Sequence, residues 1–248
     1  DSTVVDDRSY TYLVGAWDGE QEVFGGPERA FSARDAGALT GDFTSDGRVG
    51  VDDLARLADA VHTDSTQTVF EPLFDLKPDG AIDAQDGAVF AAAFGDGGAV
   101  APGGGSNAGA EIVCAIQAAE NDTWYADIMV NGALALSAYS ARVVFPAETA
   151  SLVSVTTAPP GGGVNFLNSS GGATPLTVIE SPAAGVVLLA NAIQDASALS
   201  CPNGDGFLAR LTFHGPGPCV VDVTDAFLVD ADRRIDGATT RLVDVAGE

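Results

Sequence analysis

The sequence has little positive charge, and nearly all of it is arginine. Lys77 is the only lysine, and the 248 residues carry 11 Lys and Arg against 35 Asp and Glu, for a formal net charge of −24. Such a surface repels nucleic acid and anionic membranes and attracts divalent cations. We therefore expect no nucleic-acid partner. A solvated acidic surface without bound cations explains much of the charge equally well.

Long apolar runs are also missing. No stretch of 18 apolar residues exists, so we expect no transmembrane helix and no membrane insertion. The sequence begins at Asp1 without a signal peptide. We therefore expect a mature chain or a fragment of a longer one.

Residues that serve in catalysis and in transition-metal sites are scarce. The two histidines, His62 and His214, fit neither a Ser-His-Asp order nor a zinc-binding pair. Cys114, Cys201 and Cys219 lack metal-ligand spacing. Two of them pair if the protein is extracellular, or all three are buried thiols. We expect no enzymatic activity.

Against this background, two acidic loops repeat 33 residues apart. Loop 1 covers residues 42–53 and loop 2 covers residues 75–86. Each has Asp at loop positions 1, 5 and 12, glycine at position 6 and an aliphatic residue at position 8. Calcium takes about six to eight oxygen ligands, and the glycine permits the sharp turn that gathers them. The pattern predicts two calcium sites, with a pair of metal-free acidic turns as the alternative.

The predicted ligands are side-chain oxygens completed by backbone carbonyls. They are Asp42, Thr44, Asp46, Asp53 and the carbonyl of Arg48 in loop 1, and Asp75, Asp79, Asp83, Asp86 and the carbonyls of Lys77 and Ala81 in loop 2. A lysine side chain has no acceptor atom, so Lys77 at position 3 costs loop 2 one ligand. We expect the second site to be weaker, with Asp83 compensating in part through a water molecule.

Each loop is followed by a helical pattern. Leu54, Leu57 and Val61 fall on one face of a helix, and Val89, Phe90 and Phe94 follow a similar spacing after the second loop. Residues 38–96 therefore form one calcium-binding unit of two loop–helix repeats.

This unit resembles a dockerin, whose two repeats have the form Asp-x-Asn-x-Asp-Gly-x-Ile-Asn-x-x-Asp followed by a helix. In dockerins, loop positions 10 and 11 help to set the choice of partner. The resemblance implies partner contacts at Val51, Asp52, Ala84 and Gln85. The two copies differ at these positions, which argues against a two-fold symmetric binding mode.

The N-terminal residues 1–37 predict a β-hairpin. An alternating run at 10–17 precedes a turn signal at Asp18-Gly19, and a second short strand is expected at 28–34. The pattern resembles the last two strands of a fibronectin type III domain, so the piece is a remnant of a truncated domain or a strand donated to a neighbour. The Gly- and Pro-rich residues 97–107 predict a flexible linker.

Residues 108–248 are all-β in pattern. Short strands are expected at 111–118, 125–130, 140–145, 151–156, 176–180, 185–191, 206–213, 219–227 and 240–245. About nine strands between turn residues are typical of a β-sandwich or jelly roll. The predicted fold class is thus mainly β with a small α module.

The segment 108–248 also resembles a cohesin, the partner fold of dockerins. Residues 206–213 match the cohesin run Gly-x-Leu-x-x-Leu-x-Phe, and 139–147 look like an early strand ending in an aromatic residue and proline. The alternative is another extracellular β-sandwich, such as a carbohydrate-binding module. Its sugar platform would have to use Trp124, Tyr125 or Tyr139.

Together these features predict a non-enzymatic, extracellular, calcium-dependent assembly protein. The dockerin-like unit docks on a cohesin-type sheet, either in the same chain or head to tail on further copies, as in a filament or surface scaffold. The alternative is a C-terminal targeting or glycan-binding tail of a larger secreted enzyme or adhesin.

Overall fold

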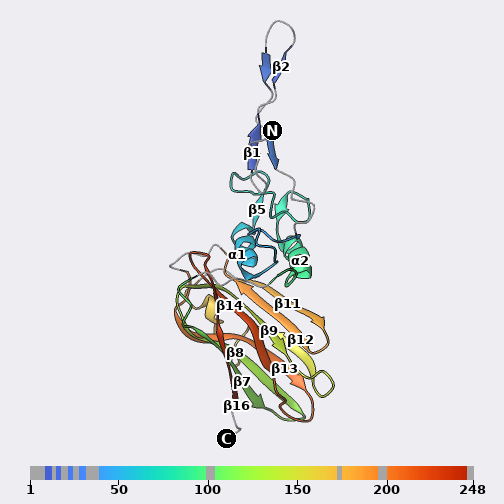
Figure 1. The fold of residues 1–248 in the computed structure, drawn as a ribbon, viewed down its shortest axis with the longest axis vertical. Coiled ribbons are helices and arrows are strands. Elements are labelled where there is room, and N and C mark those ends of the chain that lie inside the picture. The colour runs from blue at the N-terminus through green and yellow to red at the C-terminus, as the bar shows by residue number, and fades with distance from the viewer. Residues whose placement is uncertain are drawn as a thin grey trace.

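The computed structural model describes residues 9–12, 15–17, 22–24, 28–31, 39–98, 104–171, 175–194 and 200–244. A β-sandwich forms the larger part, and a small module with two helices lies against it (Figure 1). The predicted mainly-β class is confirmed. None of the helices in these ranges has the length and apolar character needed to cross a membrane.

Two five-stranded sheets form the sandwich. In spatial order, one is β10-β13-β8-β7-β16 and the other is β11-β12-β9-β14-β15. The strands are β7 (Glu111–Ala118), β8 (Thr123–Ala133), β9 (Leu136–Val144), β10 (Ser151–Thr156), β11 (Leu176–Ala183), β12 (Val186–Ala192), β13 (Gly204–His214), β14 (Asp222–Asp230), β15 (Ile235–Gly237) and β16 (Thr239–Asp244). A short 3-10 turn, η1 (Phe166–Asn168), precedes β11.

The predicted strands match these elements well. Those at 111–118 and 151–156 have the observed bounds of β7 and β10, and the others differ at their ends. Sequence analysis missed β15, because three residues are too few to show alternation. It pairs with β14 directly across a tight turn. The last strand, β16, pairs in parallel with β7.

Aromatic and aliphatic side chains between the sheets form the sandwich core. Trp124 and Phe213 stack with ring centroids 4.2 Å apart, and both are fully buried. The hydroxyl of the buried Tyr139 donates to the Leu208 carbonyl oxygen at 3.2 Å. These contacts account for the alternating apolar positions of the strands.

The small module consists of helices α1 (Val51–Ala60) and α2 (Ala84–Ala93) and the short paired strands β5 (Thr63–Asp64) and β6 (Ala81–Ile82). Both helices begin at position 10 of their acidic loop. Position 12 is therefore the third helical residue, and Asp53 and Asp86 each accept the backbone N–H of the N-cap residue at 2.8 Å. This capping fixes where each helix starts.

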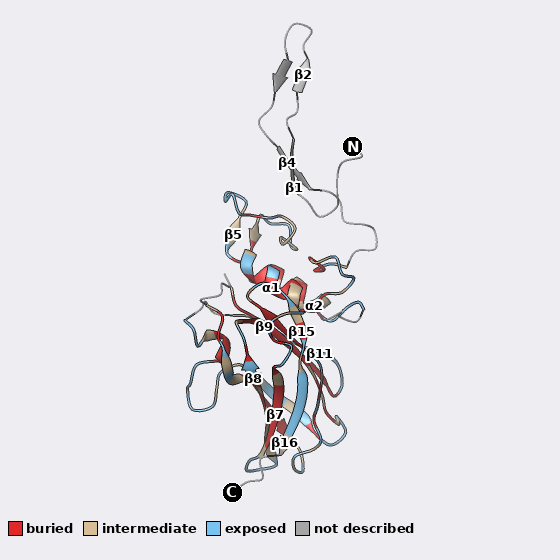
Figure 2. Ribbon diagram, turned by 60° about the vertical axis from the view of Figure 1, so that its left-hand side comes forward, coloured by how far each residue is buried: buried red, intermediate tan, exposed pale blue. Residues whose placement is uncertain are grey.

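The module and the sandwich share one hydrophobic core. Helix α1 packs against β9, β12 and β14, and α2 packs against β11. The sheet contributes Ala138, Val178, Ala190, Ala192, Phe227 and Val229, which contact a cluster of the module that includes Val51, Leu54, Leu57, Phe90 and Phe94. Figure 2 shows buried residues continuing from the sheet into both helices. The sheet is thus covered on both faces.

The backbone of the N-terminal segment is paired in two places. Strand β1 (Ser9–Tyr12) pairs with β4 (Glu28–Phe31), and β2 (Gly15–Trp17) pairs with β3 (Glu22–Phe24), all antiparallel. The strand expected at 10–17 is thus in two pieces. The turn signal at residues 18 and 19 lies outside the described residues. The relation to a fibronectin type III domain stays a prediction.

The described ends of the linker predicted at 97–107 are held by hydrogen bonds. The N–H of Gly98 donates to the Gly47 carbonyl at 3.2 Å, and Gly97 lies so close to this carbonyl that a side chain there would clash. At the other end, the Asp236 carboxylate accepts the N–H groups of Gly105 at 2.8 Å and Asn107 at 2.7 Å. Composition could not reveal these long-range bonds. Residues 99–103 lie outside the described ranges.

Candidate functional site

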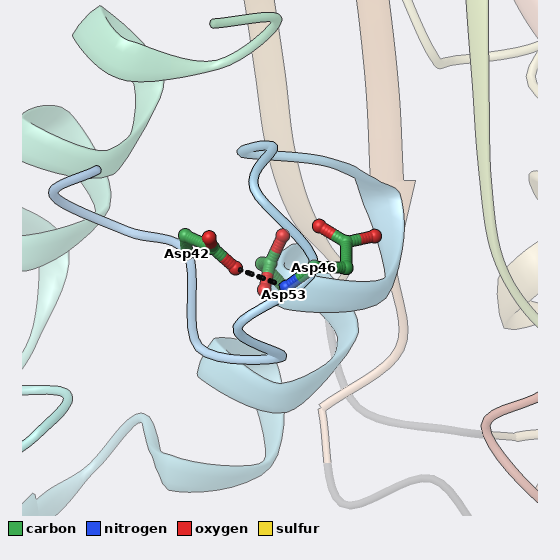
Figure 3. Close-up of side chains that lie close together, drawn as sticks. All are labelled: Asp42, Asp46 and Asp53. Carbon is green, nitrogen blue, oxygen red and sulfur yellow. Dashed lines mark hydrogen bonds between the residues drawn. The ribbon is translucent and has the colours of Figure 1, made fainter. Parts of the chain in front are cut away.

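Loop 1 gathers three carboxylates. One oxygen of each of Asp42, Asp46 and Asp53 lies within 4.8 Å of the other two (Figure 3). Asp42 is 5% exposed and Asp53 is fully buried, while Asp46 is exposed. The Thr44 hydroxyl lies beside them, at 3.4 Å from Asp42 Oδ1. All of these donors are hard oxygens, the ligand type that calcium prefers, so the residues present fit the ion.

Backbone N–H groups hold these carboxylates in place. Asp42 accepts from the N–H of Asp46 at 3.2 Å and of Gly47 at 2.9 Å, and Asp46 accepts from the N–H of Arg48 at 3.0 Å. Gly47 has φ +85°, a conformation that glycine adopts without strain. The loop therefore closes on itself around its acidic centre.

Asp53 connects the loop to helix α1. Its carboxylate accepts the N–H of Phe43 at 2.7 Å and of Thr44 at 2.8 Å, in addition to the N-cap N–H of Gly50. Burial raises the pKa of Asp53 to about 7, despite these hydrogen bonds and together with the nearby charge of Asp52. A cation beside this carboxylate would favour its ionised form.

Loop 2 repeats most of the hydrogen bonds of loop 1, 33 residues later. Asp75 accepts the N–H of Gly80 at 2.9 Å, and Asp79 accepts the N–H of Ala81 at 3.1 Å. Asp86 accepts the N–H of Lys77 at 3.0 Å, as Asp53 accepts that of Thr44. Gly80 has φ +84°, almost equal to that of Gly47. The sequence repeat is thus a repeat of local geometry.

The two loops differ in how closely their carboxylates approach. Within the described ranges, only loop 1 brings three acidic side chains within 4.8 Å of one another. Asp83, the extra acid of loop 2, accepts the N–H of Gln85 at 2.7 Å as the N-cap of α2. Lys77 is exposed and contributes its backbone N–H. Loop 2 therefore offers a looser set of oxygens than loop 1.

The four predicted partner residues fall in different surroundings. Val51 is buried in the core shared with the sandwich, and Asp52 beside it is half-buried. Burial raises the pKa of Asp52, and the charge of Asp46 adds to this effect. Ala84 and Gln85 are exposed at the start of α2. Loop positions 10 and 11 are thus buried or half-buried in the first repeat and exposed in the second.

Sequence analysis did not predict which residues of the β9 sheet contact the helical module. We call this surface of the sheet the docking face. Phe227 on β14 lies under the Arg48 guanidinium, whose central carbon is 5.1 Å from the ring centroid. Ser140 is buried and lies on the same face of β9 as Arg142. The nearly continuous apolar run at 186–192 was the available signal, because strands buried on both faces read this way.

The structure fits neither cysteine alternative in full. None of Cys114, Cys201 and Cys219 forms a disulfide, and the first two are buried as the second alternative expects, but Cys219 is half-buried. Burial raises the pKa of the Cys114 thiol to about 12, and the nearby charge of Asp127 acts in the same direction. This thiol is protonated at neutral pH and is not a nucleophile. The absence of enzymatic activity stays a prediction.

The fold and the site define a β-sandwich protein that carries a paired acidic loop–helix module on one sheet. No protein-family model matches the chain, and no curated protein matches it significantly. Similar solved structures are cohesin modules. A non-cellulosomal cohesin from the archaeon Archaeoglobus fulgidus is 12% identical, with a TM-score of 0.39 over 55% of this chain and 91% of that one.

Two bacterial cohesin structures have similarly low sequence identity and similar TM-scores. A type I cohesin–dockerin complex from Clostridium thermocellum is 8% identical, with a TM-score of 0.42 over 58% of this chain and 100% of that one. The second type II cohesin module of the ScaA scaffoldin of Acetivibrio cellulolyticus is 16% identical, with a TM-score of 0.40 over 54% of this chain and 86% of that one.

Proposed function

We propose that this chain is an extracellular, calcium-dependent docking unit whose loop–helix module binds its own sandwich. The observation that carries the proposal is the shared core, in which α1 and α2 cover the outer face of the β9 sheet. Bound in this way, the module and the sandwich act as one rigid body. Such a body would serve as a structural segment in a larger surface assembly.

Calcium would act in this unit by ordering the two loops. Each loop fixes the start of a helix through its last carboxylate, Asp53 or Asp86. Loop 1 also touches the end of α2, because Val49 exchanges backbone hydrogen bonds of 2.9 Å with Asp96 and Gly95. An ion in loop 1 would therefore hold both helices in the arrangement that fits the sheet.

Docking between chains uses the same surfaces. A module that leaves its own sandwich exposes an apolar face that matches the sheet of a second copy, and head-to-tail exchange would build an open fibre. The N–H of Gly98 bonds to loop 1, and Asp236 bonds to residues 105 and 107, so each end of the linker is held by the part of the chain that it adjoins. The span between the held ends is short, which limits the reach of the module to a second copy and favours docking in cis.

A glycan-binding role has less support. Two of the three aromatic residues available for a sugar platform, Trp124 and Tyr139, are 0% and 1% exposed. The third, Tyr125, is half-buried and lies against the Arg210 guanidinium at 4.4 Å. None of the three presents an open ring to a polysaccharide.

The test measures size and shape with and without calcium. Light scattering after size exclusion gives the mass, and small-angle scattering gives the radius of gyration, in millimolar calcium and in excess chelator over a range of protein concentrations. Docking in cis predicts a compact monomer in calcium that expands on chelation. Concentration-dependent oligomers that dissociate on chelation would replace cis docking by exchange between chains. Identical profiles in both conditions would exclude calcium dependence.

A further inference from the structure

A cavity lies between the docked module and the sandwich. Its volume is about 310 Å³, at the lower end of the range of small-molecule sites. Arg48 and Phe94 line it from the module, and Ser140, Arg142 and Asp225 line it from the sheet. Both parts of the chain are therefore needed to form it.

Two buried polar groups at this cavity have no hydrogen-bond partner among the described residues. Ser140 is 4% exposed, and its Oγ makes no hydrogen bond. Arg48 Nε is likewise buried without an acceptor. Buried polar atoms in native proteins are nearly always paired, so unpaired ones at a cavity are free to bind a water molecule or a ligand that enters it. The ring of Phe227 below Arg48 keeps the guanidinium at the cavity wall.

The charge of the lining selects the kind of ligand. Arg142 also makes no side-chain hydrogen bond or ion pair within the described part of the chain. Among the residues that line the cavity, two arginines and one serine stand against a single acid, Asp225, in a chain whose net charge is −24. Asp52 lies outside the lining, and its charge interacts with that of Arg48. The planar donor fork of arginine matches the two oxygens of a carboxylate or the edge of another oxyanion.

We propose that this cavity binds a small oxyanion, of the size of a mono- or dicarboxylate. Arg48 and Arg142 pair with its oxygens, and the Ser140 hydroxyl donates a further hydrogen bond. Asp225 at the wall disfavours ligands of high negative charge. The proposal rests on the docked arrangement of module and sandwich.

The site links ligand binding to docking and to loop 1. The ligand contacts both parts of the chain, so it stabilises the docked state by mass action. Arg48 belongs to loop 1, where its N–H donates to Asp46, so order in the loop also places this guanidinium. Because such coupling is reciprocal, calcium should raise the affinity for the anion, and the anion should raise the affinity for calcium.

The test uses malonate, acetate and inorganic sulfate as probes, in millimolar calcium, with chloride at equal ionic strength as the reference. Calorimetry should show saturable binding of one probe per chain. Arg142→Gln should weaken it about tenfold, the loss expected for one charge-assisted hydrogen bond. Arg241→Gln is the matched control, because Arg241 lies on β16 in the other sheet and pairs with Glu111. It should bind like the unmodified chain.

Ser140→Ala supplies a second and independent signature. Removing an unpaired buried hydroxyl should leave the ligand-free protein as stable as before, or more stable. The same change should lower the affinity for the probe. Equal affinities in Arg142→Gln and Arg241→Gln, or no saturable binding at millimolar probe, would overturn the anion site. Small-angle scattering on the same samples separates the causes. If the protein is compact but does not bind the probe, the anion site is refuted and the docked arrangement stands. If the protein is expanded and does not bind the probe, both the site and the docked arrangement are refuted.

Discussion

Asp59 on α1 accepts a hydrogen bond from the guanidinium of Arg233, 174 residues further along the chain. Arg233 lies in the turn between β14 and β15, and it also donates to the Ser137 hydroxyl at 3.3 Å. Both side chains are partly exposed, so the ion pair is reached by solvent. It is a direct polar bond between the module and the sandwich.

Replacing Arg233 by Gln should weaken docking only modestly. The Arg233 side chain is 20% exposed and that of Asp59 is 41% exposed, so water screens the pair and its contribution is about 1 kcal/mol or less. Urea unfolding followed at two wavelengths measures the change. Arg234→Gln is the control, because that side chain is 59% exposed and 3.9 Å from its acidic neighbour. An equal effect of both variants would remove the specific role of the pair.

A charge placed in the shared core should detach the module. Ala190 on β12 is 1% exposed beneath the helices, and an unpaired carboxylate there would destabilise the docked state by on the order of 3 kcal/mol. We expect Ala190→Asp to keep a folded sandwich and to increase the radius of gyration. Val153→Asp is the control, since Val153 is 63% exposed. A compact Ala190→Asp variant would contradict the docking.

One substitution in loop 2 should remove the difference in calcium affinity that we expect between the two acidic loops. Lys77→Asn places a side-chain oxygen at position 3 of loop 2, where Thr44 stands in loop 1. We expect calcium affinity of loop 2 to rise about tenfold, because one ligand is gained and one positive charge is lost. Lys77→Ala separates the two causes, since it removes the charge only. Calorimetric titration with calcium distinguishes them, and equal affinities in both variants would assign the gain to charge.

Acid should release the end of the linker. Burial of Asp230 opposes its ionisation, but the N–H groups of Arg234, Ser106 and Asp232 and the Ser106 hydroxyl outweigh this and lower its pKa. A lowered pKa means that the ionised group stabilises the fold above its unfolded pKa, about 3.9, and that this stability is lost as pH falls further.

Asp230→Asn measures this contribution directly. The difference in unfolding free energy between the unmodified chain and this variant should be constant near neutral pH and shrink below about pH 4. Asp232→Asn, at an exposed side chain, is the control and should show no such trend. A difference that does not change with pH would mean that the carboxylate charge is unimportant.

Much of the local structure was predictable because it depends on neighbours in sequence. The 33-residue repeat predicted two loops that share most of their hydrogen bonds, with glycines at φ +85° and +84°. The apolar spacing of Leu54, Leu57 and Val61 predicted the buried face of α1. Strands such as β7 and β10 followed from alternation bounded by turn residues. Within the repeat, each single loop, helix or strand pattern spans at most about a dozen residues.

The sequence by itself determined the loops, the helices, the strands and the acidic surface. Only the tertiary structure decided that the module lies on its own sandwich, that the linker is fastened by Asp236, and that Arg48 and Arg142 meet at one cavity. These outcomes join distant residues: Arg48 and Arg142 are 94 positions apart, Gly105 and Asp236 are 131 apart, and Asp59 and Arg233 are 174 apart. A local pattern shows that a face is apolar or that a group seeks a partner, but the three-dimensional packing selects the partner.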